Sequence, residues 1–281
     1  MTHADFEHSP VTDEARCGFL PMLAVMLGFT FFSVSMVVGV KMANGLPFGR
    51  FAAAVLVSNL VLGVYCAMLA FAASRTGLSV HLLSRQASAA AVATLLAFLF
   101  GNSLMFLFGA VAAMVYGQED ISYVLRLQGL LVPAIAVLGL NIWTTNDNAI
   151  YTAGLGLSNV TGFPKRYLVL VCGLLGTLSS IGLYARFCDW LNVLNVLIPP
   201  FGAIILMHLF LCRVGRSRTA SPVAAIASWA LGSFVALCGF GYLDGLLFLC
   251  CGIPALNGMA VAALAYFLLR NLKSVSRCNS N

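Results

Sequence analysis

The chain has 281 residues, of which 61% are hydrophobic and only 9% are charged, and its formal net charge is +6. An ordinary soluble domain carries about 25% charged residues, so this chain has too few charges to cover a surface exposed to water. The composition excludes a soluble globular enzyme, a disordered chain and a nucleic-acid-binding domain. It predicts an all-α polytopic membrane protein.

A membrane-spanning helix needs about 20 mostly apolar residues, and eight stretches of the chain meet this requirement. In chain order they are 18–41, 51–73, 88–116, 128–157, 167–185, 190–212, 222–241 and 253–271. Their apolar runs are continuous rather than alternating, which favours helices over strands. We expect a transmembrane domain over 18–271, between an N-terminal tail at 1–17 and a C-terminal tail at 272–281.

The distribution of positive charge predicts the orientation. With eight spans and a cytoplasmic N-terminus, eleven of the fifteen Lys and Arg residues lie on the cytoplasmic side and four on the far side. Cytoplasmic loops of membrane proteins carry such an excess of positive charge. We therefore expect a multi-pass protein of the inner (plasma) membrane with both termini in the cytoplasm.

The first stretch contains a pattern typical of a broken transmembrane helix. Gly28 is followed by hydroxyl residues that include Ser33 and Ser35, and unwound segments of this kind expose backbone carbonyls that bind ions. Small and hydroxyl residues are also typical of helix packing in lipid, so both interpretations stay open. Asn59 and Asn102 are single amides in the next two stretches, and we interpret them as interhelical hydrogen bonds.

The most polar transmembrane segment is 141–148, with the sequence NIWTTNDN, in the fourth stretch. Four of its polar side chains recur at the spacing of one helix face: Asn141, Thr144, Thr145 and Asn148. Their neutral oxygens suit a monovalent cation or a hydrogen-bonded ligand, although polar contacts between helices are the alternative. Asp147 lies beside this face, and an ionisable residue inside a span is a functional candidate by default.

The chain shows no nucleophile–base pair, no cluster of metal-ligating residues and no glycine-rich loop that could bind phosphate. Each of these patterns would be needed for a common class of enzyme. We therefore expect no enzymatic activity, no catalytic residue and no cofactor other than a bound cation.

Four segments together resemble the nucleobase–cation symporter family, also called the purine–cytosine permease family. They are 30–36 (TFFSVSM), 76–85 (TGLSVHLLSR), 101–109 (GNSLMFLFG) and 139–151 (GLNIWTTNDNAIY). The resemblance implies a leucine-transporter-like fold built from inverted repeats. It also implies transport of cytosine or a related nucleobase together with a cation, sodium, by secondary symport.

The resemblance is discontinuous along the chain. Residues 18–85 resemble the family's first two helices and residues 88–271 resemble its seventh to twelfth helices. The resemblance thus implies an internally truncated fold of about eight transmembrane helices, without the third to sixth. Loss of an even number of helices preserves the direction of every later one, in agreement with the charge distribution.

The resemblance also implies roles for individual residues. The cation would be bound by two backbone carbonyls and three side chains, those of Phe32, Ser35, Asn141, Thr144 and Thr145. The substrate would be bound near Ser33, Asn146 and Asp147. The expected partners are a nucleobase, a sodium ion and the lipid bilayer, and we expect no nucleic acid.

Two functions stay open on this basis. One is a symporter, whose missing helices an oligomer would replace. The other is a non-transporting remnant, or a membrane subunit that acts through helix packing, because alternating access needs one repeat to move against the other.

Overall fold

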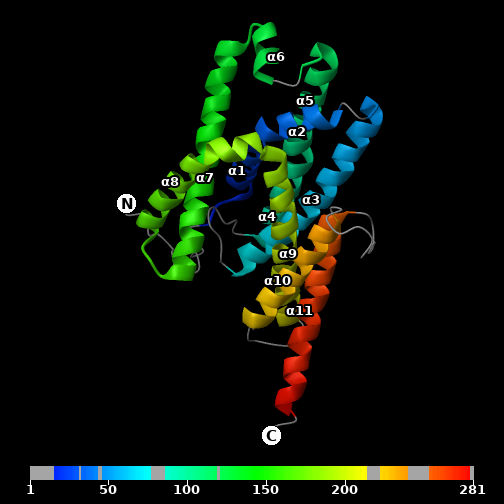
Figure 1. The fold of residues 1–281 in the computed structure, drawn as a ribbon, viewed down its shortest axis with the longest axis vertical. Coiled ribbons are helices and arrows are strands. Elements are labelled where there is room, and N and C mark those ends of the chain that lie inside the picture. The colour runs from blue at the N-terminus through cyan, green and yellow to red at the C-terminus, as the bar shows by residue number, and fades with distance from the viewer. Residues whose placement is uncertain are drawn as a thin grey trace. The chain divides into compact units, whose positions relative to one another are not determined.

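The computed structural model describes residues 16–31, 33–43, 46–76, 86–118, 121–213, 222–239 and 253–278. The elements of these residues are helices, which agrees with the predicted all-α class (Figure 1). The chain divides into two compact units, 1–176 and 177–281.

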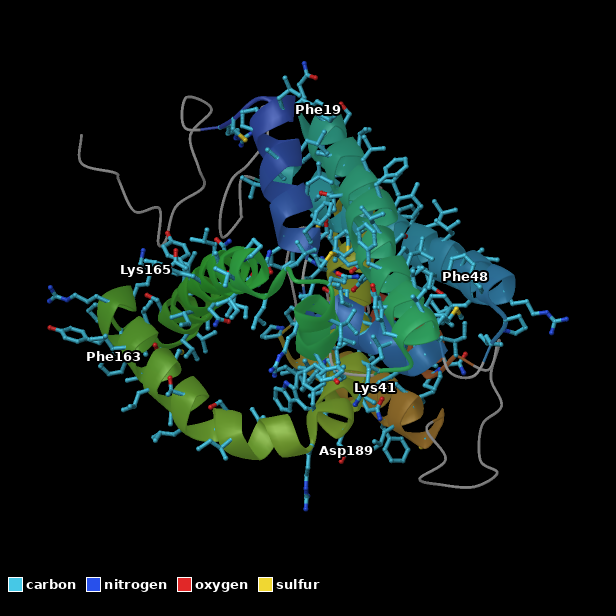
Figure 2. All side chains as sticks on the ribbon, turned by 90° about the horizontal axis from the view of Figure 1, so that it is seen from above. Phe19, Lys41, Phe48, Phe163, Lys165 and Asp189 are labelled. Carbon is cyan, nitrogen blue, oxygen red and sulfur yellow. The ribbon has the colours of Figure 1, made fainter. Side chains whose placement is uncertain are left out.

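The first predicted span consists of two helices, α1 (Phe19–Thr30) and α2 (Ser33–Ala43). Their axes differ by 51° across a short break, so the predicted break in this span is present. The following helix, α3 (Phe48–Thr76), is a long continuous span. In Figure 2 the labels Lys41 and Phe48 mark the end of α2 and the start of α3.

The third predicted span has three parts: α4 (Ala87–Leu96), the π-helical segment η2 (Ala97–Asn102) and α5 (Ser103–Tyr116). Its first half packs against α1 and α3, and its second half packs against α2. The contact between α2 and α5 is very close, because a Cβ atom at Gly39 would overlap the carbonyl oxygen of Phe106. A Cβ atom at Gly109 would likewise overlap the carbonyl oxygen of Met36. Small residues allow this kind of backbone approach between transmembrane helices.

The first unit continues with the short helix α6 (Ile121–Leu127), the long helix α7 (Leu131–Thr161) and the start of α8 (Lys165–Ala185). Helix α7 ends at Gly162, whose φ of 74° is the left-handed conformation common after helices. Phe163 and Lys165 mark this turn in Figure 2. The Ser158 hydroxyl donates a hydrogen bond of 2.7 Å to the Phe163 carbonyl, which helps to hold the turn.

The second unit contains the end of α8 and the helices α9 (Phe187–Arg213), α10 (Pro222–Leu237) and α11 (Pro254–Cys278). Its core is apolar apart from one hydroxyl and consists of Ile204, Leu211, Ala224, Ala262 and Tyr266. Helices α10 and α11 approach closely at Gly232, where a Cβ atom would lie 2.6 Å from the Gly258 carbonyl oxygen. Helix α11 extends to Cys278, so most of the predicted C-terminal tail is helical.

Each of the eight predicted spans coincides with one helix or with two or three consecutive helical segments. Four helices of the described residues are long and apolar enough to cross a membrane, and there are five such spans if the bent pair α1–α2 is counted as one. Two shorter apolar helices lie at Pro222–Leu237 and Pro254–Arg270. Helix α7 has 31 residues, but the polar segment 141–148 interrupts its apolar run. The count of eight spans therefore stays a prediction.

Candidate functional site

The candidate site is formed around the break between α1 and α2. Helix α1 ends at Thr30, and the next residue, Phe31, has φ and ψ of −73° and 56°, which depart from the helical region. Two groups at the end of the helix donate hydrogen bonds to the Leu27 carbonyl oxygen: the Phe31 backbone N–H at 2.9 Å and the Thr30 hydroxyl at 3.0 Å. The chain then leaves the helical path, so the Phe31 carbonyl is available to a group outside the first span.

The polar face of α7 reaches this break. The amide nitrogen Nδ2 of Asn141 donates a hydrogen bond of 2.8 Å to the Phe31 carbonyl oxygen, across 110 residues of sequence. One turn later, the Thr145 hydroxyl donates a 2.7 Å hydrogen bond to the Asn141 carbonyl. This bond holds the Thr145 oxygen on the same side of α7 as Asn141. The structure therefore brings Asn141 to the break, and Thr145 lies one turn further along the same face of α7.

A second chain of hydrogen bonds lies on the other side of the break. The Ser35 hydroxyl donates to Oδ1 of Asn102 at 2.6 Å, and Nδ2 of Asn102 donates to Oδ1 of Asn59 at 2.7 Å. These residues belong to α2, η2 and α3. The interpretation of Asn59 and Asn102 as interhelical hydrogen bonds is thus confirmed. Their connection to Ser35 was not predicted, because a single amide in an apolar run does not indicate its partner.

The structure does not describe the side chains of three predicted site residues. Phe32 lies outside the described residues, and the side chains of Ser33 and Thr144 are also not described. Ser33 is the first residue of α2, directly after the break. Thr144 belongs to α7, between Asn141 and Thr145.

The structure does not bring the other predicted substrate residues to the break. Asn146 and Asp147 are exposed on α7. Within the described part of the chain, no hydrogen bond joins either of them to α1 or α2. Their assignment to the substrate stays a prediction.

The arrangement around the break is one of neutral oxygen atoms. It combines the backbone at the end of α1 with the amide of Asn141, and the hydroxyl of Thr145 follows one turn along α7. Hard cations prefer such oxygen ligands, and unwound carbonyls of this kind coordinate sodium in transporters with broken helices. The described residues thus fit one half of a site for a monovalent cation.

The sequence of the chain matches a known protein family. Two stretches of the chain, 10–88 and 86–241, match the family of permeases for cytosine/purines, uracil, thiamine and allantoin. The chain belongs to this family. Together with its long apolar helices, family membership makes the chain an integral membrane protein.

Similar proteins include the cytosine permeases of three Escherichia coli strains, K12, O6:H1 and O157:H7. Each is 28% identical to this chain over 398 aligned residues, covering 94% of this chain and 94% of the relative. Because 94% of 281 residues is about 264, about 134 of the 398 aligned positions hold no residue of this chain. The two stretches matched by the family meet at 86–88, which is the start of α4.

Proposed function

We propose that this chain serves nucleobase transport, moving cytosine or a related base across the inner membrane together with a cation. The proposed cation is sodium and the proposed mechanism is secondary symport, with both termini in the cytoplasm. Family membership supports the transport of a base. The neutral oxygen groups around the break support the coupling to a cation.

One observation carries the cation part of the proposal: the hydrogen bond between Asn141 and the Phe31 carbonyl. It joins the two elements that supply cation ligands in the family, the break of the first span and the polar face of α7. Both elements are retained in this chain, so a cation half-site is retained with them. The proposed ligands are the carbonyls of Phe32 and Ser35 and the side chains of Asn141, Thr144 and Thr145.

A second candidate function is a membrane subunit that does not transport by itself. It is favoured by the roughly 134 aligned positions of the cytosine permeases that have no counterpart here. At about 20 residues per span plus connections, this length corresponds to several helices. We propose that they are the third to sixth helices of the family, and that an assembly must replace them for transport to occur.

Uptake of radiolabelled cytosine separates the two candidates. The chain is expressed in cells that lack a cytosine permease of their own, and uptake is measured with and without sodium. Sodium-dependent uptake above background is the result expected of a symporter. If the protein reaches the membrane and uptake stays at background, the second candidate is correct.

The half-site is tested in the same assay by the substitution Asn141→Ala. We expect it to remove the sodium-dependent part of the uptake, because the hydrogen bond to Phe31 and one cation ligand are lost together. Asn159→Ala is the matched control, since Asn159 is an exposed amide near the other end of α7. Equal sodium dependence in the Asn141→Ala variant and the wild type would exclude Asn141 from the cation site.

A further inference from the structure

The break of the first span is bounded by the π-helical segment η2 as well as by α7. Two consecutive residues of η2 contact the two sides of the break. A Cβ atom at Gly101 would overlap the hydroxyl of Thr30, the last residue of α1. Asn102 accepts the hydrogen bond of Ser35, in the first turn of α2. The segment η2 thus touches both halves of the broken span.

The π-helical geometry explains how one continuous span can do this. A π segment inserts about one extra residue into an α-helix, and each residue of an α-helix turns the chain by about 100°. The side chains before and after the insertion therefore face different neighbouring helices. Accordingly, α4 packs against α1 whereas α5 packs against α2. Asn102 is the last residue of the insertion and lies where the change of face occurs.

Asn102 also has the chemistry that this position needs. It accepts a hydrogen bond from the Ser35 hydroxyl and donates one to the Asn59 side chain, at 2.6 and 2.7 Å. An amide side chain offers an acceptor and a donor on one rigid plane. Asn59 is only 4% exposed, and a buried polar group is costly unless it is hydrogen-bonded. Burial therefore favours the hydrogen-bonded arrangement of the Ser35, Asn102 and Asn59 side chains.

We propose that Asn102 is a positioning residue for the break: it fixes the first turn of α2 against η2 and α3. The turn that it fixes carries Ser33 and Ser35, whose backbone lies next to the carbonyl held by Asn141. Asn102 acts on the cation through Ser35 and does not contact the cation itself. The link to the cation rests on the proposed function, whereas the positioning of α2 does not.

The test uses the purified full chain in lipid nanodiscs and two measurements. Hydrogen–deuterium exchange reports whether the first turn of α2 is held, without any need for sodium. The sodium concentration that half-saturates thermal stabilisation reports the cation site. The variants are Asn102→Ala, Ser35→Ala and the double variant. Thr94→Ala is the control, because it removes a buried 2.8 Å hydrogen bond within α4.

We expect Asn102→Ala and Ser35→Ala each to speed exchange in the first turn of α2, and the double variant to match the single ones, because residues in one network are not additive. We also expect the half-saturating sodium concentration to rise about tenfold, the effect of one lost hydrogen bond. Thr94→Ala is expected to lower the melting temperature without changing either measurement.

The outcomes are distinct. Unchanged exchange in the Asn102→Ala variant overturns the proposal, whatever sodium does. Faster exchange with an unchanged half-saturating sodium concentration overturns the link between Asn102 and the cation. If exchange is faster in the Asn102→Ala variant but sodium does not stabilise the wild-type protein, the positioning role is supported and the proposed cation coupling is contradicted.

Discussion

Thr145 and Asn141 show how the polar side chains of one helix turn can use their donors within the protein. The Thr145 hydroxyl donates a hydrogen bond to the Asn141 carbonyl, which leaves the lone pairs of the hydroxyl oxygen as acceptors. The amide nitrogen of Asn141 donates a hydrogen bond to the Phe31 carbonyl oxygen. Both side chains therefore use donors within the protein, and oxygen is the group with which a cation would interact.

This arrangement predicts the effect of Thr145→Ala. The substitution removes one oxygen ligand, so we expect it to abolish stabilisation of the protein by sodium. The measurement is the thermal unfolding midpoint in detergent as a function of sodium concentration, with potassium as the ionic-strength control. Serine at the same position keeps the hydroxyl, so Thr145→Ser is expected to retain most of the response.

Thr152→Ala is the matched control for Thr145→Ala. The Thr152 hydroxyl makes the same 2.7 Å hydrogen bond to the carbonyl four residues earlier. It lies seven residues further along α7, about 10 Å from Thr145 at 1.5 Å per residue. We expect this variant to keep the full sodium response. If the Thr145→Ala and Thr152→Ala variants respond equally to sodium, Thr145 is not a cation ligand.

At the scale of elements, glycine decides how the helices of the first unit pack. The contact between α2 and α5 is made by the backbone, because Gly39 and Gly109 lie against carbonyl oxygens of the opposite helix. This close approach determines where the first turn of α2 lies relative to η2. Backbone atoms cannot yield in the way a flexible side chain can, so the interface has little tolerance for a larger residue.

We expect Gly109→Ala to destabilise the protein by about 1–3 kcal/mol, the usual cost of forcing extra atoms into a packed interface. Gly176→Ala on α8 is the control, because a Cβ atom there has no neighbour within 4 Å. The measurement is the thermal unfolding midpoint in detergent. A Gly109→Ala protein as stable as the Gly176→Ala protein would show that α2 and α5 are not in backbone contact.

Prediction from sequence was most successful where one physical property dominates. Long apolar runs predicted the places of the helices, and the spacing of Asn141 and Thr145 predicted their common face. The partner of Asn141 could not be predicted from spacing, because the Phe31 carbonyl is 110 residues away and belongs to the backbone. The π segment before Ser103 was also missed, since its residues are as apolar as those of an ordinary helix.

At the scale of the whole molecule, two helices, α8 and α7, have exposed surfaces. In the most apolar window of Lys165–Leu183 no residue is buried, although this helix is long enough to cross the membrane. On α7, Asn146 and Asp147 are exposed. A polar group that faces hydrocarbon without a partner costs several kcal/mol. The positions missing relative to the cytosine permeases give a reason for this exposure.

We therefore expect the segment 141–148 to be covered in the membrane, either by a second copy of the chain or by closure of the remaining helices across the gap. A hydrophobic carbodiimide tests this expectation, because it reacts with a carboxyl group that faces lipid. Asp147 should resist the reagent in native membranes and react after unfolding in a denaturing detergent. The Asp147→Asn variant identifies the labelled site.

Light scattering of the protein in nanodiscs distinguishes the two kinds of cover. A mass of two or more chains indicates that another copy covers the segment, and a single-chain mass with a protected Asp147 indicates that the chain's own helices close over it. A single chain whose Asp147 reacts readily in native membranes would contradict the expectation. Assembly can replace the missing helices only if another copy of the chain covers the segment. If the protein is instead a non-transporting subunit, we expect a single-chain mass, a protected Asp147 and no uptake of cytosine.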